Sequence, residues 1–390
     1  MSKETHNINE NFSVKVVHNL DEFANLKDVW NSLAEKNESY VPWLSWDWFN
    51  LCLKHFSDGS KLFILVLYKG DSVIGIAPFV IKHEIFRGIL KVKKIELLGN
   101  VYSPIRNFIL GDSRDETKVT LTSNTIQFFR EVYKGWDILE LDSIPEENNV
   151  FKTIKDVISI SGMKHKTYFC FGNWYLNGIS YNSEQYFSNL PKAIRKDIQY
   201  CQRSLQKKGK LQFELKKDIC SFEYYSNLYD ELRDKSWKAP EKDRVFQREF
   251  EKLAAEKGWL RFGFLSHGNN PIASQKWIVR NKIAYILAVL YHEEYHKYSP
   301  GKILTSEMAK WVIDEDKVVE IDFMRGDDSY KKDWTPNRRE RRGITLFNCT
   351  IKAQLLAFLM LRALPVIETN QYLLSVKNRF SGFLKKRLQK

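Results

Sequence analysis

Four consecutive residues, Ser299-Pro300-Gly301-Lys302, have the composition of a turn that begins a helix and binds an anion. The first backbone N–H groups of a helix have no partner within the helix, and the helix dipole is positive at that end. Gly301 would let the backbone approach a ligand closely, and Lys302 adds a cation, so the pattern predicts a site for a diphosphate. The same residues also suit an ordinary helix start, with a serine N-cap and a proline in the first turn, which needs no ligand.

A second group of polar residues follows the next apolar segment of the chain. Asp322 ends an otherwise apolar strand-like run, and Asp327, Tyr330 and Lys331 come shortly after it. Because an unpaired carboxylate in such a strand is costly, Asp322 is expected either to bond to nearby backbone N–H groups or to have a raised pKa and act as a base. Lys331 is suited to stabilise an oxyanion or to bind a phosphate, but an isolated lysine is also a common surface residue.

The segment His292-Glu293-Glu294-Tyr295-His296 matches the H-E-x-x-H pattern of zinc peptidases. That chemistry requires a helix long enough to place both histidines on one face. The residues before this segment are strand-like, and Pro300 arrives four residues after His296, so at most one helical turn fits. We therefore predict no metal site here.

Two further groups of residues have a structural and a functional interpretation each. Trp43, Trp46 and Trp48 could form a platform for sugar stacking, although a tryptophan cluster is more often part of a core. The basic run from Arg338 to Arg342 could face a phosphate or could be a solvated loop.

The elements that would position these residues occur in a similar order in both halves of the chain. Each half contains helices, then strands joined by short turns, then a helix and another strand, which predicts an α+β fold and not a doubly wound α/β fold. The expected helices are 21–36, 45–55, 118–133, 191–208, 222–235, 244–257 and 302–314. The expected strands are 12–18, 62–68, 72–82, 93–98, 108–110, 136–141, 259–266, 272–280, 283–291 and 318–324.

The net charge of +13 is concentrated in two segments. Residues 191–210 hold seven cations against Asp197, and residues 376–390 hold six cations and no acid. Such stripes suit an anionic partner, for example a phosphate-bearing donor, a nucleic acid or a lipid surface, and they also occur as solvated helix faces.

Five scattered cysteines, the polar first fourteen residues and the lack of a long uncharged apolar run predict a cytoplasmic protein. Residues 351–390 are expected to form a basic amphipathic tail of two helices separated at Pro365. This tail could lie on the inner, anionic face of a membrane, dock on its own protein or bind a partner.

Several motifs resemble the BioF2-like, CelD-type branch of the GNAT acyltransferase superfamily, which is associated with polysaccharide biosynthesis. The resemblance extends from about Phe12 to Thr350, and its strongest element is the order and spacing of Ser-Pro-Gly, Asp-Phe and Gly-x-x-x-Tyr-Lys. The motifs are Pro42 to Trp48, Gly75 to Phe79, Leu190 to Asp197, Lys207 to Leu211, Ile272 to Gln275, Tyr291, Tyr298 to Leu304, Ile321 to Phe323, Gly326, Tyr330-Lys331 and Trp334.

This resemblance implies tandem GNAT-like domains at 12–175 and 185–350, as in the Fem transferases, with mixed, antiparallel-rich sheets flanked by helices. It implies that an amine attacks an acyl thioester while Ser299, Pro300, Gly301 and Lys302 hold the donor phosphates. The turn departs from the usual Gln/Arg-x-x-Gly-x-Gly/Ala pattern, so the donor stays open between acetyl-CoA and other acyl thioesters.

The resemblance also implies roles for residues around the turn. Tyr330-Lys331 is similar to the pair that contributes a lysine to the acyl-transfer centre of Fem transferases, so Lys331 would stabilise the oxyanion and Asp322 or Asp327 would accept a proton. The residues expected to bind substrate are Arg195, Lys196, Gln275 and Tyr291.

The leading prediction is therefore N-acyl transfer from an acyl-CoA-type cosubstrate to an amine on a sugar or envelope precursor, with no tightly bound cofactor. One alternative is aminoacyl transfer from tRNA, which a basic helix would also suit. The other is a GNAT-like module without activity that binds a polymer or a membrane partner.

Overall fold

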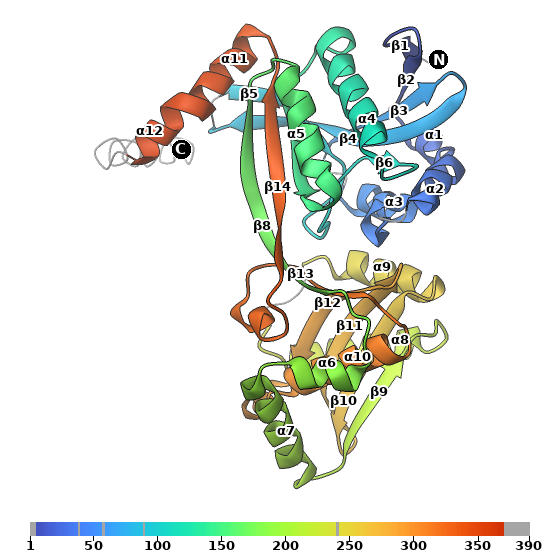
Figure 1. The fold of residues 1–390 in the computed structure, drawn as a ribbon, viewed down its shortest axis with the longest axis vertical. Coiled ribbons are helices and arrows are strands. Elements are labelled where there is room, and N and C mark those ends of the chain that lie inside the picture. The colour runs from blue at the N-terminus through green and yellow to red at the C-terminus, as the bar shows by residue number, and fades with distance from the viewer. Residues whose placement is uncertain (1–4, 38–39, 57–58, 89, 239–241, 370–390) are drawn as a thin grey trace, which may run out of the picture.

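The computed structural model describes residues 5–37, 40–56, 59–88, 90–238 and 242–369. Within these ranges the strands form one 14-stranded mixed sheet, flanked by helices and divided into two lobes (Figure 1). The strands are β1 (Thr5–Asn7), β2 (Phe12–Val17), β3 (Lys61–Lys69), β4 (Ser72–Phe86), β5 (Leu90–Leu97), β6 (Ile109–Leu110), β7 (Ile138–Pro145), β8 (His165–Asn177), β9 (Leu211–Lys216), β10 (Leu260–His267), β11 (Asn270–Arg280), β12 (Ile283–Tyr291), β13 (Glu320–Arg325) and β14 (Arg338–Phe347).

The helices cover the faces of this sheet. The α-helices are α1 (Leu20–Ala24), α2 (Lys27–Lys36), α3 (Trp46–His55), α4 (Asp115–Gln127), α5 (Val150–Ile160), α6 (Ser183–Asn189), α7 (Lys192–Gln206), α8 (Phe222–Asp234), α9 (Arg244–Glu256), α10 (Pro300–Asp314), α11 (Ile351–Phe358) and α12 (Leu364–Thr369). The short 3-10 and π turns are η1 (Pro42–Leu44), η2 (Phe128–Val132), η3 (Glu147–Asn149), η4 (Glu293–Tyr298), η5 (Ser329–Asp333) and η6 (Leu359–Ala363).

Each lobe contains one parallel strand pair joined by a crossover helix. In the first lobe, α4 connects β5 to β7, and in the second lobe α10 connects β12 to β13. The remaining ladders are antiparallel. The predicted α+β fold, with two similar halves and antiparallel-rich sheets, is confirmed.

The long strands β8 and β14 join the lobes (Figure 1). β8 pairs with β14 along most of its length and with β13 near its end, and β14 also pairs with β7. The strand that follows the second lobe in sequence thus completes the sheet of the first lobe. The division at residues 175 and 185 stays a prediction.

Three large apolar clusters form the core. One lies within each lobe, and a third joins aromatic residues of α2, α3 and η1 to residues of α8 and α9. Trp43, Trp46 and Trp48 belong to this joining cluster and are buried, which confirms the core interpretation of the tryptophans.

Two expectations from the sequence are wrong. The basic run from Arg338 to Arg342 is the start of β14 and not a solvated loop, and Arg341 is only 1% exposed because Glu147 neutralises it across a 2.6 Å contact. Pro365 does not divide the tail, since 351–369 is helical throughout and the wider turn η6 precedes the proline. The rest of the predicted tail lies outside the described residues.

No helix among the described residues combines the length and the apolar character needed to cross a bilayer.

Candidate functional site

The strands β12 and β13 separate partway along their length. They pair in parallel only from Ile283 to Tyr285 against Glu320 to Asp322. Beyond these pairs β12 continues to Tyr291 and β13 to Arg325. Backbone groups of separated strands can bond to an extended ligand, as an exposed sheet edge does. We refer to this space between the strands as the β12–β13 opening.

A bulge in β13 produces this separation. The register of β13 against β8 shifts between Asp322 and Arg325, and Met324 has a φ of +58°. This conformation is strained for a residue with a side chain, so the surroundings must hold it. Asp322 Oδ1 accepts hydrogen bonds from Met324 N at 2.6 Å and from Asn173 Nδ2 at 2.7 Å, and Asn173 Nδ2 also lies 3.1 Å from Met324 O.

The second carboxylate oxygen of Asp322 is also occupied. Arg339 Nη2 lies 2.5 Å from Oδ2, and the same guanidinium bonds to Glu320 and Asn173. Asp322 is buried, and of the two roles expected for it these contacts fit the structural one. Asp322 is a positioning residue that fixes the bulge, and this arrangement leaves it poorly placed to accept a proton from a substrate.

Lys331 lies under the loop that follows β13, where it is buried and not on the surface. Its ammonium donates to Arg325 O at 2.8 Å and to Gly326 O at 3.3 Å, and it lies 3.2 Å from the Asp328 carboxylate. These contacts hold the loop against the end of β13, beside the opening.

The other predicted residues of this loop lie nearer the surface. Arg338 makes two hydrogen bonds to Asp327, at 2.7 and 2.8 Å, and Trp174 Nε1 donates to it at 3.2 Å. The Arg338 guanidinium holds the pKa of Asp327 below its usual range, which makes this carboxylate a weak base. The side chain of Tyr330 is exposed.

A groove of about 510 Å³ runs beside the β12–β13 opening. Leu287 and Ala288 of β12 and Met324 and Arg325 of β13 form one side of it. The remaining lining residues are Trp43, Trp48, Val101, Tyr102, Pro104, Arg233, Lys238, Lys242, Phe246, Gln247, Phe250 and Glu251. The groove therefore combines aromatic walls with four cationic side chains.

Glu251 is the acidic member of this lining. It is buried, and it contacts Lys276 Nζ at 2.7 Å and Arg244 Nη1 at 3.1 Å. Among the described lining residues, four cations stand against this one carboxylate, so the lining has a net positive formal charge, which suits an anionic ligand.

The start of α10 is held firmly in place. Ser299 has a left-handed backbone with φ +43°, and its carbonyl accepts from Lys302 N at 2.9 Å and Ile303 N at 3.3 Å. Ser299 is the N-cap residue, as the sequence predicts, but its hydroxyl makes no capping hydrogen bond. Pro300 and Gly301 are buried, and Lys302 Nζ lies 2.8 Å from Asp197 of α7.

Gln275, which the sequence places among the substrate-binding residues, supports this turn from β11. It is fully buried, and its Nε2 donates to Gly301 O at 2.9 Å and to Thr305 Oγ1 at 2.7 Å. Its Oε1 accepts from Trp277 Nε1 at 2.8 Å. Gln275 therefore has no free polar group to offer a ligand.

Replacing Gln275 with alanine is expected to lower the free energy of unfolding by about 2–4 kcal/mol, because it removes three buried hydrogen bonds, leaves Trp277 Nε1 without its acceptor and opens a cavity. Urea denaturation measures this effect. Gln199→Ala, at an exposed position of α7, is the control and should change stability by less than about 0.5 kcal/mol. Equal stability of the two variants would contradict the role given to Gln275.

Arg195, Lys196 and Tyr291 lie outside the groove lining. Arg195 Nε donates to Leu190 O at 3.1 Å, and Lys196 is exposed on α7. The Tyr291 hydroxyl lies 2.9 Å from His296 Nδ1, at the end of β12 that leads to Ser299. The structure thus gathers the predicted residues in two places, at the start of α10 and around the bulge of β13.

The H-E-x-x-H segment forms the 3-10 helix η4 with His292 as its N-cap. A short 3-10 helix does not present the two histidines on one face as an α-helix does, which agrees with the single turn expected. Among the described residues, no group of three or more His, Cys, Asp or Glu side chains is placed to hold a metal ion.

In the first lobe, the parallel strands β5 and β7 also separate, but the segment around Arg106 occupies the space between them. Arg106 N donates to Ser143 O of β7 at 3.1 Å, and its guanidinium reaches Asp142 Oδ1 at 2.8 Å and Leu97 O of β5 at 3.4 Å. Arg106 therefore bridges β5 and β7 where they part. Of the two parallel strand pairs, β12 and β13 in the second lobe are therefore the pair whose separation lies open beside the 510 Å³ groove.

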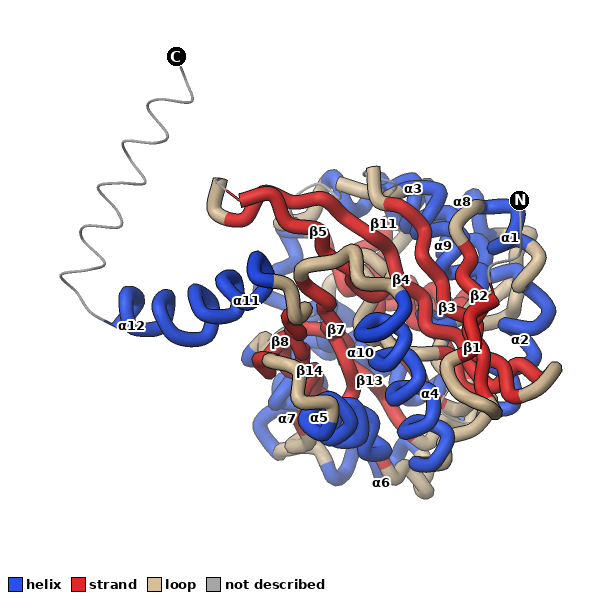
Figure 2. Tube along the Cα trace, turned by 90° about the horizontal axis from the view of Figure 1, so that it is seen from above, coloured by secondary structure: helices blue, strands red, loops and turns tan. Residues whose placement is uncertain are grey.

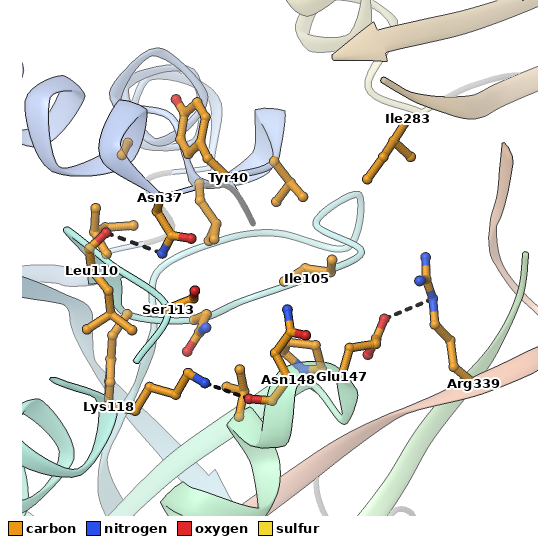
Figure 3. A pocket seen from close by; sticks show the side chains of 18 of the residues that line it. Asn37, Tyr40, Ile105, Leu110, Ser113, Lys118, Glu147, Asn148, Ile283 and Arg339 are labelled. Atoms are coloured by element: carbon orange, nitrogen blue, oxygen red, sulfur yellow. Dashed lines mark hydrogen bonds and ion pairs between the residues drawn. The ribbon is translucent and has the colours of Figure 1, made fainter. Parts of the chain in front are cut away.

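A second cavity, of about 390 Å³, lies between the lobes (Figure 3). Its polar groups bond mainly to one another, as Lys118 Nζ does to Asn148 O at 2.6 Å and Arg339 to Glu147 at 2.9 Å. The edge contact between the rings of Trp43 and Tyr285, at 4.8 Å, lies between this cavity and the groove. The groove, with its cationic lining, is the stronger candidate for a substrate.

Comparison with known proteins identifies the type of domain in the second lobe. Residues 192–332 match the family model described as an acetyltransferase (GNAT) domain, which covers the second lobe from α7 to η5. The chain is also similar to the crystal structure of FemX, with a TM-score of 0.57, 12% identity, and coverage of 88% of this chain and 99% of FemX. No curated protein matches the sequence.

Two further structures are similar at a lower level. A conserved protein of unknown function from Bacteroides thetaiotaomicron VPI-5482 has a TM-score of 0.49 and 10% identity, covering 83% of this chain and 97% of that one. A tandem GNAT protein from the clavulanic acid biosynthesis pathway has a TM-score of 0.45 and 13% identity, covering 85% and 98%. The family match thus gives a GNAT-type domain in the second lobe, and the similarity to FemX shows the fold over 88% of the chain.

Proposed function

We propose that the protein is an N-acyltransferase of the CelD type, which moves an acyl group from an acyl thioester to an amine on a sugar or polysaccharide precursor. The observation that carries this proposal is the β12–β13 opening with the groove beside it, inside the segment that matches a GNAT domain. A thioester arm that lay between the two strands could bond to the backbone that β12 and β13 leave unpaired.

The start of α10 would hold the donor phosphates. It follows β12 directly, and Gly301 and Lys302 lie in its first turn, where backbone N–H groups and the helix dipole favour an anion. Gln275 and Asp197 act on this turn from neighbouring elements and keep its geometry.

The groove would hold the acceptor. Lys242 and Arg325 are exposed, and with Arg233 and Lys238 they line a groove suited to a carboxylate or a phosphate on the acceptor. Lys331 and Tyr330 would act from the loop beside the opening, where Lys331 keeps the backbone in place for the transfer. Since Asp322 and Asp327 are both engaged by arginines, the amine would release its proton to water.

Aminoacyl transfer from tRNA is the second candidate, and α7 is the observation that favours it. Lys192, Lys196, Arg203, Lys207 and Lys208 are exposed on or next to this helix, and α7 is tied to the start of α10 through Asp197. A basic surface beside the donor turn would suit a phosphate backbone.

Isothermal titration calorimetry with acetyl-CoA, longer acyl-CoA thioesters and aminoacyl-tRNA separates these functions. We expect one acyl-CoA molecule to bind per chain, because Arg106 fills the corresponding space in the first lobe. Two donors per chain would contradict the assignment of the first lobe. Binding of aminoacyl-tRNA alone would favour the second candidate, and binding of neither donor would contradict both.

A further inference from the structure

The helix formed by α11, η6 and α12 projects from the body of the molecule beside β5 (Figure 2). Its first turn is well anchored. The Thr350 hydroxyl accepts from Ala353 N at 3.3 Å, and Lys352 Nζ lies 2.6 Å from Asp137 Oδ2. The direction in which this helix leaves the sheet is therefore fixed by specific contacts.

One face of the helix is packed against the sheet. Ala353, Leu356 and Ala357 are each 0% exposed, and Leu356 and Ala357 share an apolar cluster with residues of β5, β7 and β14. This buried face explains how the helix is held, and it leaves the opposite face outward.

The outward face is also apolar. Ile351 is 92% exposed, Leu355 53% and Phe358 58%. Their spacing of four and three residues places the three side chains in one row, and the next position in that row is Arg362. A helix that is apolar on two sides normally has both sides covered, so this row is a contact surface for a partner.

Charge identifies the kind of partner. The chain that follows this helix carries six cations and no acid between residues 376 and 390, and the whole chain has a net charge of +13. A second copy of the same chain would carry the same net charge of +13, so two copies repel each other. An anionic lipid surface accepts apolar side chains and cations together.

We propose that Ile351, Leu355 and Phe358 insert at the surface of an anionic membrane, with the helix lying along the interface and the exposed Arg362, next in the row, at the level of the lipid phosphates. This is a peripheral contact, which requires no membrane-spanning helix. The contact would hold the first lobe, on which the helix packs, at the membrane, and it does not depend on the acyl-transfer proposal.

Vesicle sedimentation with the full chain tests this. The vesicles contain phosphatidylcholine alone or phosphatidylcholine mixed with phosphatidylglycerol. We expect binding only to the mixed vesicles, with an affinity that decreases as salt is added. Leu355→Glu/Phe358→Glu should weaken this binding at least about tenfold, because burying these side chains is the apolar part of the interaction. The control Ile160→Glu, at an 86% exposed position of α5, should bind as the parent does.

Several outcomes would overturn the proposal. Equal binding by the double variant and the parent would show that the row does not touch lipid, and so would an absence of binding to both vesicle types. A dimer in sedimentation velocity that forms without lipid and is lost in the double variant would show that this face binds a second copy. Because both substitutions are at exposed positions, the thermal unfolding of the double variant should match that of the parent and exclude misfolding.

Discussion

Replacing Asp322 with alanine is expected to lower the free energy of unfolding by about 3–5 kcal/mol. The substitution leaves the Arg339 guanidinium without its 2.5 Å partner and removes the acceptor of the Met324 and Asn173 bonds. The strained backbone of Met324 would then relax, so the β12–β13 opening should change as well. Urea denaturation measures the first effect, and hydrogen exchange of the β13 amides measures the second.

Two comparisons make this result specific. Asp156→Ala, at an exposed position of α5, should change stability by less than about 0.5 kcal/mol. Asn173→Ala should increase exchange in the same β13 amides, because Asn173 bonds to both Asp322 and Met324. If Asp322→Ala were as stable as the parent and lost only turnover, Asp322 would be a catalytic base and not the residue that fixes the bulge.

Replacing Ala288 with tryptophan is expected to weaken donor binding about 10- to 100-fold. Ala288 is half-buried on β12, at the point where β13 no longer pairs with it and where the groove begins. An indole ring at this position would fill the space that the thioester arm requires. Calorimetry with an acyl-CoA thioester gives the affinity directly.

A matched substitution separates blocking from misfolding. Val245→Trp adds the same ring at a position of α9 that is 66% exposed and outside the groove lining, and it should bind the donor as the parent does. Both variants should unfold at temperatures close to that of the parent, since neither removes a core contact. Unchanged affinity in Ala288→Trp would mean that the donor does not use the β12–β13 opening.

The sequence predicts the elements of this fold well where periodicity and turn residues agree. The basic helix α7, the meander β10 to β12 and the strand-turn-helix at Ser299 all lie close to their predicted positions. It does not predict β14, because the charged run that begins at Arg338 resembles a loop when its partners are unknown. Those partners, such as Glu147 and Asp322, are far away in the sequence.

The candidate site is predicted only in part, for a similar reason. The turn at Ser299 to Lys302 has a local signal, whereas the bulge at Met324 depends on Asn173 and Arg339, which approach Asp322 only in the folded sheet. No sequence motif marks Leu287, Ala288 or Arg325 as residues that line a groove. An aspartate in an apolar strand is the available signal, and it leaves open whether Asp322 bonds to backbone groups or acts as a base; it does not predict the bulge.

The central claim is that a single acyl donor lies between β12 and β13 in the second lobe. A crystal structure of the protein with a non-hydrolysable acyl-CoA analogue tests it most directly. We expect the thioester arm between Leu287–Ala288 and Met324–Arg325, with the phosphates at the first turn of α10. An analogue bound in the cavity between the lobes, or in the first lobe beside Arg106, would contradict the claim.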